Sequence, residues 1–202
     1  MASATSQTGD RLAHVSDPAM EFLLSEVLHW VERSCHHKQS GDGNPQDEEE
    51  AAMFEAEMAA TKLERMGYSV GYRLCERLAQ NKTFGAASAQ SRDPAQAVAA
   101  SQLEAVKFLC KEFWMEVFRK QIDKLQTNHR GVFVLKDMEM RWLTRLPPNQ
   151  EEARVAALQL LAFPCGLVRG ALSNLGIPAV VSCDFLADGT HMAACSFNIK
   201  IK

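Results

Sequence analysis

The chain has 202 residues, 47% of them hydrophobic and 23% charged, which are the proportions of an ordinary single globular domain. The net charge of −3, without a basic stripe carrying interleaved aromatic residues, argues against nucleic-acid binding through bulk electrostatics. No apolar run approaches the roughly 20 residues that cross a bilayer, and six cysteines without CxxC spacing indicate a reducing compartment rather than a disulfide framework.

The N-terminal half is predicted to be helical, with two polar interruptions. Residues 1–16 are rich in Ser, Thr, Ala and Gln and are expected to form a disordered leader without the pattern of a secretory signal. A helix is predicted from Asp17 to about Cys35, followed by a low-complexity loop at about 38–49. A second helix over 50–66 should end at Gly67, and a third should cover about 70–80.

The C-terminal half mixes helices and strands. After a low-complexity loop at about 84–100, a strong apolar stripe predicts a helix over 102–118. Strands are expected at 131–135 and 141–146, and a helix at 151–175 that Pro164 should kink. A closing hairpin of 179–185 and 192–201 would turn at Asp188-Gly189. The predicted fold is α+β: about four to five helices packed on one face of a four-stranded antiparallel sheet.

Motifs for catalysis are missing from the sequence. There is no GxxxxGK[ST], no GxGxxG and no GxSxG pattern. His129 falls in a predicted turn, without a signature that pairs it with an acid or a nucleophile. Cys35, His36 and His37 are adjacent on a predicted helix, about 100° apart, so they converge poorly on one ion. We therefore expect no catalytic residues, no cofactor and no metal.

Three stretches carry a specific resemblance: residues 62–78 (KLERMGYSVGYRLCERL), residues 106–135 with KFLCKEFW and TNHRGV, and residues 163–177 (FPCGLVRGALSNLGI). Together they resemble the Bet-three family of small subunits of the transport protein particle, TRAPP, and most closely its subunit-six branch. The resemblance spans about residues 17–202, as a single domain. Its signature positions are expected to be structural: Gly67, Gly71, Trp114, Asn128, Gly131, Cys165, Gly166, Arg169, Gly170 and Gly176.

The resemblance implies a function without catalysis by this chain. It implies a heterodimer with the Bet-three subunit inside a cytoplasmic complex, peripheral to Golgi and endoplasmic reticulum membranes. That complex tethers transport vesicles and promotes nucleotide exchange on a Rab-type GTPase, through a surface built mainly by other subunits. The founding subunit carries an acylated cysteine after its third helix, whereas residues 80–85 (QNKTFG) contain none, so acylation is not expected here.

A surplus of apolar residues on the first two helices suggests where a partner binds. Phe22 and Leu28 lie off the axis of the apolar stripe of the first helix, and Phe54 and Met58 are i, i+4 neighbours on the second. The candidate interface consists of Phe22, Leu23, Val27, Leu28, Trp30, Phe54 and Met58. One helix face can serve the core and another a partner, although the same residues would also complete a wide core face. An alternative function is binding of a small molecule or lipid, in a tunnel lined by Leu74, Phe108 and Val180. An enzyme is the third and weakest hypothesis, because convergent titratable groups are lacking.

Overall fold

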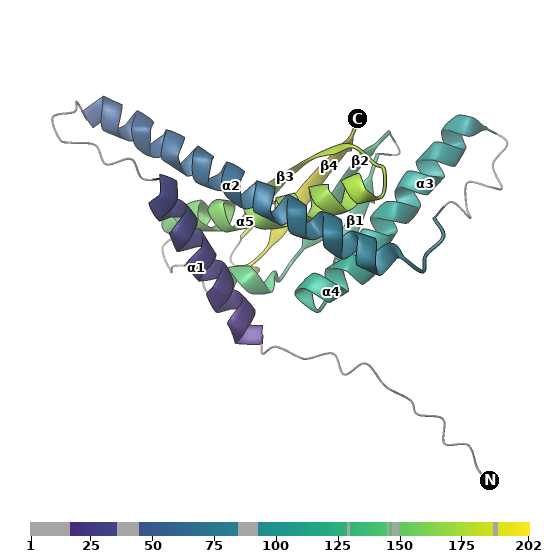
Figure 1. Ribbon diagram of the computed structural model, residues 1–202, viewed down its shortest axis with the longest axis horizontal. Helices are drawn as coiled ribbons and strands as arrows, with labels where there is room; N and C mark the ends of the chain where they lie inside the picture. Colours follow the sequence, from purple (N-terminus) through teal and green to yellow (C-terminus); the bar gives the residue numbers. More distant parts are fainter. Residues whose placement is uncertain are drawn as a thin grey trace, which may run out of the picture.

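Figure 1 shows the computed structural model of the chain, which describes residues 17–35, 45–84, 93–128, 130–144, 146, 150–187 and 190–202. The α-helices are α1 (Asp17–Cys35), α2 (Pro45–Ala79), α3 (Pro94–Phe108), α4 (Trp114–Phe118) and α5 (Gln150–Asn174). A π-helical segment, η2 (Leu109–Phe113), joins α3 to α4, and a 3₁₀ turn, η3 (Arg141–Leu143), precedes α5. The strands are β1 (Lys124–Thr127), β2 (Val132–Asp137), β3 (Ala179–Phe185) and β4 (Cys195–Ile201).

The four strands form one antiparallel sheet in the order β1-β2-β4-β3. Leu135 of β2 pairs with Leu125 of β1 on one side and with Phe197 of β4 on the other. Leu135 and Phe197 are completely buried, whereas Val180 on β3 is half exposed. The alternation places one face of the sheet against the helices and leaves the other to solvent. The predicted α+β fold, with helices on one face of a four-stranded antiparallel sheet, is confirmed.

Helix α5 is the centre of the molecule, because it packs on α2 with one side and on β3 with the other. Where α2 crosses α5, four glycines meet the backbone of the facing helix. A Cβ atom on Gly71 would lie 2.1 Å from the carbonyl oxygen of Leu167, and one on Gly166 would lie 2.1 Å from that of Glu64. Gly67 and Gly170 face the partner helix in the same way. The backbones of α2 and α5 are therefore in direct contact, and a side chain at any of these four positions would force them apart.

By length and composition, the stretch Glu152–Asn174 within α5 is apolar enough to span a membrane, contrary to the expectation that no apolar run approaches that length. In the fold many of its apolar residues belong to the core: Leu161, Leu167, Ala171 and Leu172 are almost fully buried, whereas Val155 and Leu158 near its start are exposed. Pro164 lies inside α5, and the helix continues past it to Asn174. An interior helix that is apolar on most sides is typical of a buried core element.

The helix from Pro94 to Phe118 is continuous but changes its winding in the middle. Over Leu109–Phe113 it is π-helical, and the backbone N–H of Ile122 donates to the carbonyl of Cys110 at 3.0 Å. Arg119 ends the helix in the left-handed conformation, with φ of 59°. The segment turns Trp114 and Phe113 fully into the core.

Several element boundaries differ from the sequence prediction. The helices expected at 50–66 and 70–80 are one helix, α2, because Gly67 is not a stop but a contact point with α5. The predicted strand at 141–146 is instead the η3 turn, and the fourth strand is β1, whose Lys124 and Gln126 give it only a weak apolar signal. The loops predicted at 38–49 and 84–100 are shortened, since α2 begins at Pro45 and α3 at Pro94.

The Asp93 side chain explains the start of α3. Its Oδ1 atom accepts a hydrogen bond from the backbone N–H of Ala95 at 3.0 Å, as an N-cap does, and Pro94 occupies the first helical position. The leader at 1–16, His36, His37, His129 and the predicted turn at Asp188-Gly189 lie outside the described residues.

Candidate partner interface

Helices α1 and α2 meet at one end of α1 and diverge toward the other. At the C-terminal end of α1, the Lys62 ammonium donates to the Ser34 hydroxyl at 3.1 Å. From that contact the two helices open like a V, as Figure 1 shows, with α1 leading away toward the N-terminus. Leu24 and Val31 anchor α1 to the core, with 8% and 0% of their surfaces exposed. The remaining faces of α1 are therefore available to form a surface.

Five of the seven residues proposed for the interface are exposed. Phe22, Leu23 and Trp30 on α1 have 62%, 56% and 58% of their surfaces accessible, and Phe54 and Met58 on α2 have 63% and 41%. Exposed aromatic and aliphatic side chains at this density are typical of protein-binding surfaces.

Val27 and Leu28 are placed differently, because they are half-buried and pack against the core. For these two residues, the alternative that they complete a core face fits the structure better than a direct role in binding.

Trp30 of α1 and Met58 of α2 flank the same helix contact. Trp30 lies one helical turn before Ser34, and Met58 lies one turn before Lys62. Residues four apart share a helix face, so both side chains lie beside the Ser34–Lys62 hydrogen bond. Phe54 continues the α2 face by one more turn, on the half of α2 that projects past α1 in Figure 1. The apolar surface thus runs from one helix onto the other.

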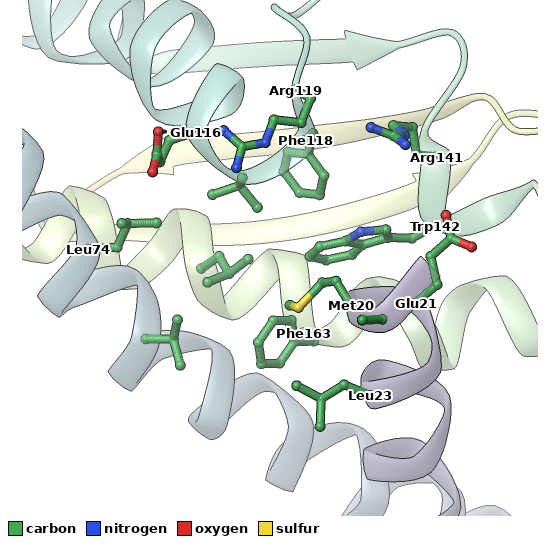
Figure 2. Close-up of a pocket in the computed structure, with 14 residues that line it drawn as sticks. Met20, Glu21, Leu23, Leu74, Glu116, Phe118, Arg119, Arg141, Trp142 and Phe163 are labelled. Carbon is green, nitrogen blue, oxygen red and sulfur yellow. Dashed lines mark ion pairs between the residues drawn. The ribbon is translucent and has the colours of Figure 1, made fainter. Parts of the chain in front are cut away.

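A pocket of about 560 Å³ fills the opening of the V, and we call it the α1–α2 pocket. Figure 2 shows Met20 and Leu23 of α1 and Leu74 of α2 lining it, with Phe163 of α5 at its base. Glu116, Arg119 and Arg141 lie along one side of the cavity, where Arg119 and Glu116 form an exposed ion pair at 3.9 Å. The pocket is therefore apolar inside and charged at one rim.

The inner wall of the α1–α2 pocket is the end of a row of aromatic rings. Trp114 packs on Phe197 of β4 and on Phe118, with ring centroids 5.2 and 4.3 Å apart. Phe118 then packs on Trp142 at 4.6 Å, and Trp142 on Phe163 at 6.1 Å. The Trp114–Phe197 pair is edge-on and the other three pairs are tilted, and aromatic rings attract one another at about these separations. The row gives the pocket a rigid wall supported by the sheet.

A second cleft, of about 440 Å³, lies on the other side of α1. Phe22 and Leu28 of α1, Trp142 of η3 and Leu160 of α5 line it. Trp142 borders both cavities, so it separates them. Helix α1 consequently has a largely apolar cavity on each side.

A buried charge cluster lies at the far end of the aromatic row. Asp137 is completely buried and accepts hydrogen bonds from the Trp114 indole at 2.9 Å, from the Lys120 ammonium at 2.7 Å and from the Glu139 backbone at 3.1 Å. Lys120 also donates to Asp123 at 2.9 Å. Burial alone would lower the pKa of Lys120, but the hydrogen bonds to the two carboxylates raise it above its ordinary value. The cluster is a satisfied structural ion pair.

The other signature residues shape the backbone or join helices. Asn128 Oδ1 accepts from the backbone N–H groups of Arg130 and Val132, and Gly131 adopts a φ of 80° in the same β1–β2 turn. Gly176 ends α5 with a φ of 74°. The Arg169 guanidinium lies 3.1 Å from the Glu64 carboxylate and over the ring of Tyr68, linking α5 to α2.

The tunnel proposed from Leu74, Phe108 and Val180 is wrong. Leu74 lines the α1–α2 pocket, Phe108 is buried against Phe84, and Val180 is half exposed on the solvent face of β3. Within the described part of the chain, no three His, Cys, Asp or Glu side chains lie close enough to hold a metal ion.

The sequence prediction missed the pocket wall, above all Trp142 and Phe118. Trp142 falls in the strand predicted at 141–146, and Phe118 is only the predicted end of the helix over 102–118. Met140 and Leu143 are both buried and lie three residues apart, a spacing that is typical of a helical turn rather than of a strand.

Comparison with known proteins agrees with this architecture. The pattern that describes transport protein particle (TRAPP) components matches residues 20–202. The chain is 36% identical to trafficking protein particle complex subunit 6b of Danio rerio over 189 residues, covering 93% of this chain and 99% of that protein. It is 42% identical to human subunit 6B over 142 residues, 70% of this chain and 78% of that one.

A solved structure shares the fold. It is trafficking protein particle complex subunit 3 from Naegleria fowleri, covalently bound to palmitic acid, with a TM-score of 0.54 and 16% identity. The similarity covers 93% of this chain and 97% of that one.

Proposed function

The chain belongs to the family of transport protein particle (TRAPP) components, and we propose that it serves in the trafficking complex as a scaffold subunit that pairs with the Bet-three subunit. The predicted subunit-six branch is confirmed by its relatives, which are named subunits 6A and 6B. Pairing with Bet-three, support of Rab nucleotide exchange by the assembly, and peripheral attachment to Golgi and endoplasmic reticulum membranes through the complex are parts of this proposal.

The observation that carries the proposal is the apolar surface over α1 and α2. Leu23, Trp30 and Met58 are large, exposed and apolar. Trp30 and Met58 lie one helical turn from the contact between Ser34 and Lys62, and Leu23 lines the α1–α2 pocket. Hot spots of protein interfaces are clustered aromatic and large apolar side chains that fit into pockets of the partner, or pockets that receive them. A pocket with a rigid aromatic wall and a charged rim suits an apolar side chain of a folded subunit.

The roles of the signature residues support a scaffold rather than an enzyme. Gly67, Gly71, Gly166 and Gly170 allow two helices to touch, Asn128 and Gly131 form a hairpin turn, and Trp114 holds a buried carboxylate. Each of these roles maintains shape. In this proposal the exchange surface for the Rab-type GTPase is built mainly by other subunits, and this chain positions them.

The test is co-expression with the Bet-three subunit, followed by size-exclusion chromatography. Leu23→Glu combined with Trp30→Glu places two charges on the proposed interface without entering the core. Loss of a hot spot costs about 2 kcal/mol or more, so each change should weaken pairing about 30-fold or more.

The matched control is Val98→Glu on α3, where the side chain is 58% exposed, as Trp30 is. The Val98 variant should co-elute with the partner normally. If the double variant folds and still co-elutes, α1 is not the contact. Val27 is unsuitable for this test, because it packs on the core and a charge there would destabilise the fold.

Binding of an acyl chain is a second candidate function, favoured by one observation. The α1–α2 pocket has about 560 Å³ and an apolar lining, within the range of small-molecule sites. Native mass spectrometry of the chain purified without detergent would reveal a bound lipid. If the Leu74→Trp variant, whose larger side chain fills the pocket, no longer carries that lipid, lipid binding is favoured. An empty pocket in the unmodified chain would instead favour the scaffold function alone.

A further inference from the structure

Strand β3 is an edge strand whose outer side is unpaired within the described part of the chain. It pairs with β4 at one end of the sheet order β1-β2-β4-β3, and no strand of the described residues lies beyond it. Natural edge strands are usually protected by a lysine, a proline or a bulge. β3 has seven residues (AVVSCDF), pairs with β4 in unbroken register and carries a single charge, that of Asp184. Its free edge is therefore long and has none of these protections.

The hydrogen bonds to β4 determine which backbone groups of β3 are free. Just past the end of β3, the N–H of Leu186 donates to the carbonyl of Ala194 at 2.8 Å, so the even-numbered residues bond to β4. Because bonded pairs alternate along antiparallel strands, the odd-numbered residues turn their N–H and C=O groups away from β4. These residues are Ala179, Val181, Cys183 and Phe185. Each therefore offers one donor and one acceptor to an added strand.

Helix α5 has an exposed strip beside this free edge. Residues four and seven apart share a helix face, and Leu158, Ala162 and Arg169 form such a strip. The strip lies between the α2 contact at Gly166 and the buried face at Cys165. Leu158 is 41% exposed, whereas Cys165 is 5% exposed. Since α5 packs on β3 and β3 ends the sheet, the exposed strip borders the free edge.

The strip is apolar beside one end of β3 and cationic beside the other. α5 and β3 run in opposite directions, because a short turn over 175–178 joins them. Leu158 lies about 24 Å before the end of α5, and Leu186 lies about 23 Å after the start of β3, so the two exposed apolar side chains are at the same level. The same rises place Arg169 beside Val181, each about 7 Å from the turn.

A hollow widens the cationic end of the strip. It has a volume of about 650 Å³, opens to solvent and is lined by Arg169 of α5 and by four residues of α2, Arg65 among them. The Glu64 carboxylate lies 3.1 Å from the Arg169 guanidinium and compensates one positive charge. The lining itself contains two guanidinium groups and no carboxylate. A carboxylate from outside the chain is therefore complementary to this end of the strip.

We propose that the free edge of β3 binds an extended segment of a partner protein as a fifth, antiparallel strand, with an apolar side chain over Leu158 and a carboxylate at Arg169. Alternate side chains of such a strand face α5. The residue opposite Phe185 then lies beside Leu158, and the residue four positions later lies opposite Val181, beside Arg169. Strand addition takes its affinity from backbone pairing and its specificity from such alternate side chains. The segment is thus defined by an apolar residue followed four positions later by Asp or Glu.

The proposal goes beyond the pairing of subunits, because none of the residues named for this site lines the α1–α2 pocket. A second copy of the chain does not fit the same edge. Paired strands lie about 4.8 Å apart, whereas packed helices keep about 8–10 Å between their axes. Since α5 packs on β3, two copies joined at β3 would bring their α5 helices closer than helices pack. A segment without a helix layer of its own avoids this conflict.

The test uses the full chain and the fluorescein-labelled peptide Ser-Thr-Leu-Thr-Val-Thr-Glu-Thr-Ser, with binding followed by fluorescence anisotropy. The expected result is saturable binding. The peptide in which Leu and Glu exchange places is the matched control and should bind more weakly, because its apolar and acidic side chains meet the wrong ends of the strip. A peptide with Gln in place of Glu should bind up to about fivefold more weakly, as expected for a partly exposed ion pair.

Two variants of the chain test the edge and the strip separately. Val181→Pro removes an outward N–H without touching the bonds to β4 and should abolish binding, whereas Val181→Ala keeps that N–H and should bind the peptide. Leu158→Glu places a charge on the strip without entering the core and should weaken binding about tenfold or more, even where Val181→Pro fails to fold. Val98→Glu on α3 should bind as the unmodified chain does.

Amide hydrogen exchange locates the bound peptide. The free N–H groups of Val181 and Cys183 should exchange more slowly with peptide present, whereas those of Ser182 and Asp184, already bonded to β4, should change little. Absence of saturable binding, equal binding by Val181→Pro, or protection confined to α1 and α2 would overturn the proposal. Dimerisation of the chain alone that Val181→Pro abolishes would also overturn it, since a second copy would then occupy the edge.

Discussion

The crossing of α2 and α5 makes a quantitative prediction through Gly71. Replacing Gly71 with Ala adds one Cβ atom at a point 2.1 Å from the Leu167 carbonyl oxygen and 2.7 Å from the carbonyl carbon and Cα of the same residue. Ordinary contact requires at least about 3.4 Å between such atoms. All three obstacles are backbone atoms of a buried helix, so no side chain can rotate away. The helices must move apart.

The expected loss combines two effects of opposite sign. Overpacking of a tight core costs about 1–3 kcal/mol, and a backbone obstacle places Gly71→Ala at the upper end, about 3 kcal/mol. Alanine is a better helix former than glycine by about 1 kcal/mol, which offsets part of the loss. The net destabilisation is therefore about 2 kcal/mol. For a chain of this length that lowers the melting temperature by about 4–8 °C.

Urea unfolding followed by far-ultraviolet circular dichroism measures this loss directly. Ser69→Ala on the exposed face of α2 is the control, and it should change the free energy of unfolding by no more than about 0.5 kcal/mol. Gly67→Ala combined with Gly71→Ala should cost less than the sum of the single changes, because one separation of the helices makes room for both. A Gly71→Ala protein as stable as the unmodified chain would refute the close crossing.

Four further substitutions test the charge cluster around Lys120 and the β1–β2 hairpin. Lys120→Met removes the cation that faces the buried Asp137 carboxylate and should cost about 3 kcal/mol in urea unfolding, whereas Trp114→Phe, which removes one hydrogen bond to it, should cost about 1–3 kcal/mol. Burial alone would raise the pKa of Asp123, but hydrogen bonds from the Met138 backbone and from Lys120 lower it. The contribution of Asp123 to stability should therefore be complete at neutral pH and be lost as the pH drops below about 4. In Asp123→Asn, the urea concentration at the midpoint of unfolding should depend less on pH in this acidic range. Asn128→Ala loses two hydrogen bonds in the β1–β2 turn and should lower the free energy of unfolding by about 1–2 kcal/mol, with exchange of the β1 amides accelerated in hydrogen-exchange measurements.

Local patterns in the sequence predicted the class of fold because they report burial on one side of each element. The stripe through Leu109 and Trp114, both fully buried, and the closing hairpin of β3 and β4 were predicted correctly for that reason. The role of Gly67 could not be read locally, because a glycine that ends a helix and a glycine that touches another helix look alike until the second helix is in place. β1 was missed because a short edge strand with polar outward residues carries little apolar signal.

The interface residues show a similar limit. Spacing along α1 predicts which residues share a face, but the rotation of the helix against the core decides which face is covered. That rotation buries Leu24 and Val31, leaves Leu23 and Trp30 exposed, and sets Val27 between them. The α1–α2 pocket could not be predicted at all, since residues from α1, α2, α4, η3 and α5 meet there only through the tertiary fold.

The aromatic row has an optical consequence. The chain has three tryptophans, and they differ in environment: Trp30 is exposed on α1, Trp142 is half-buried between the two cavities beside α1, and Trp114 is sealed in the core. Trp30 and Trp142 thus lie where a partner is proposed to bind. Trp114, in the core, should emit at short wavelength whether or not the partner is bound. The unlabelled chain therefore carries its own reporters: Trp30→Phe and Trp142→Phe would assign any shift of emission on complex formation to the helix surface or to the cavity wall.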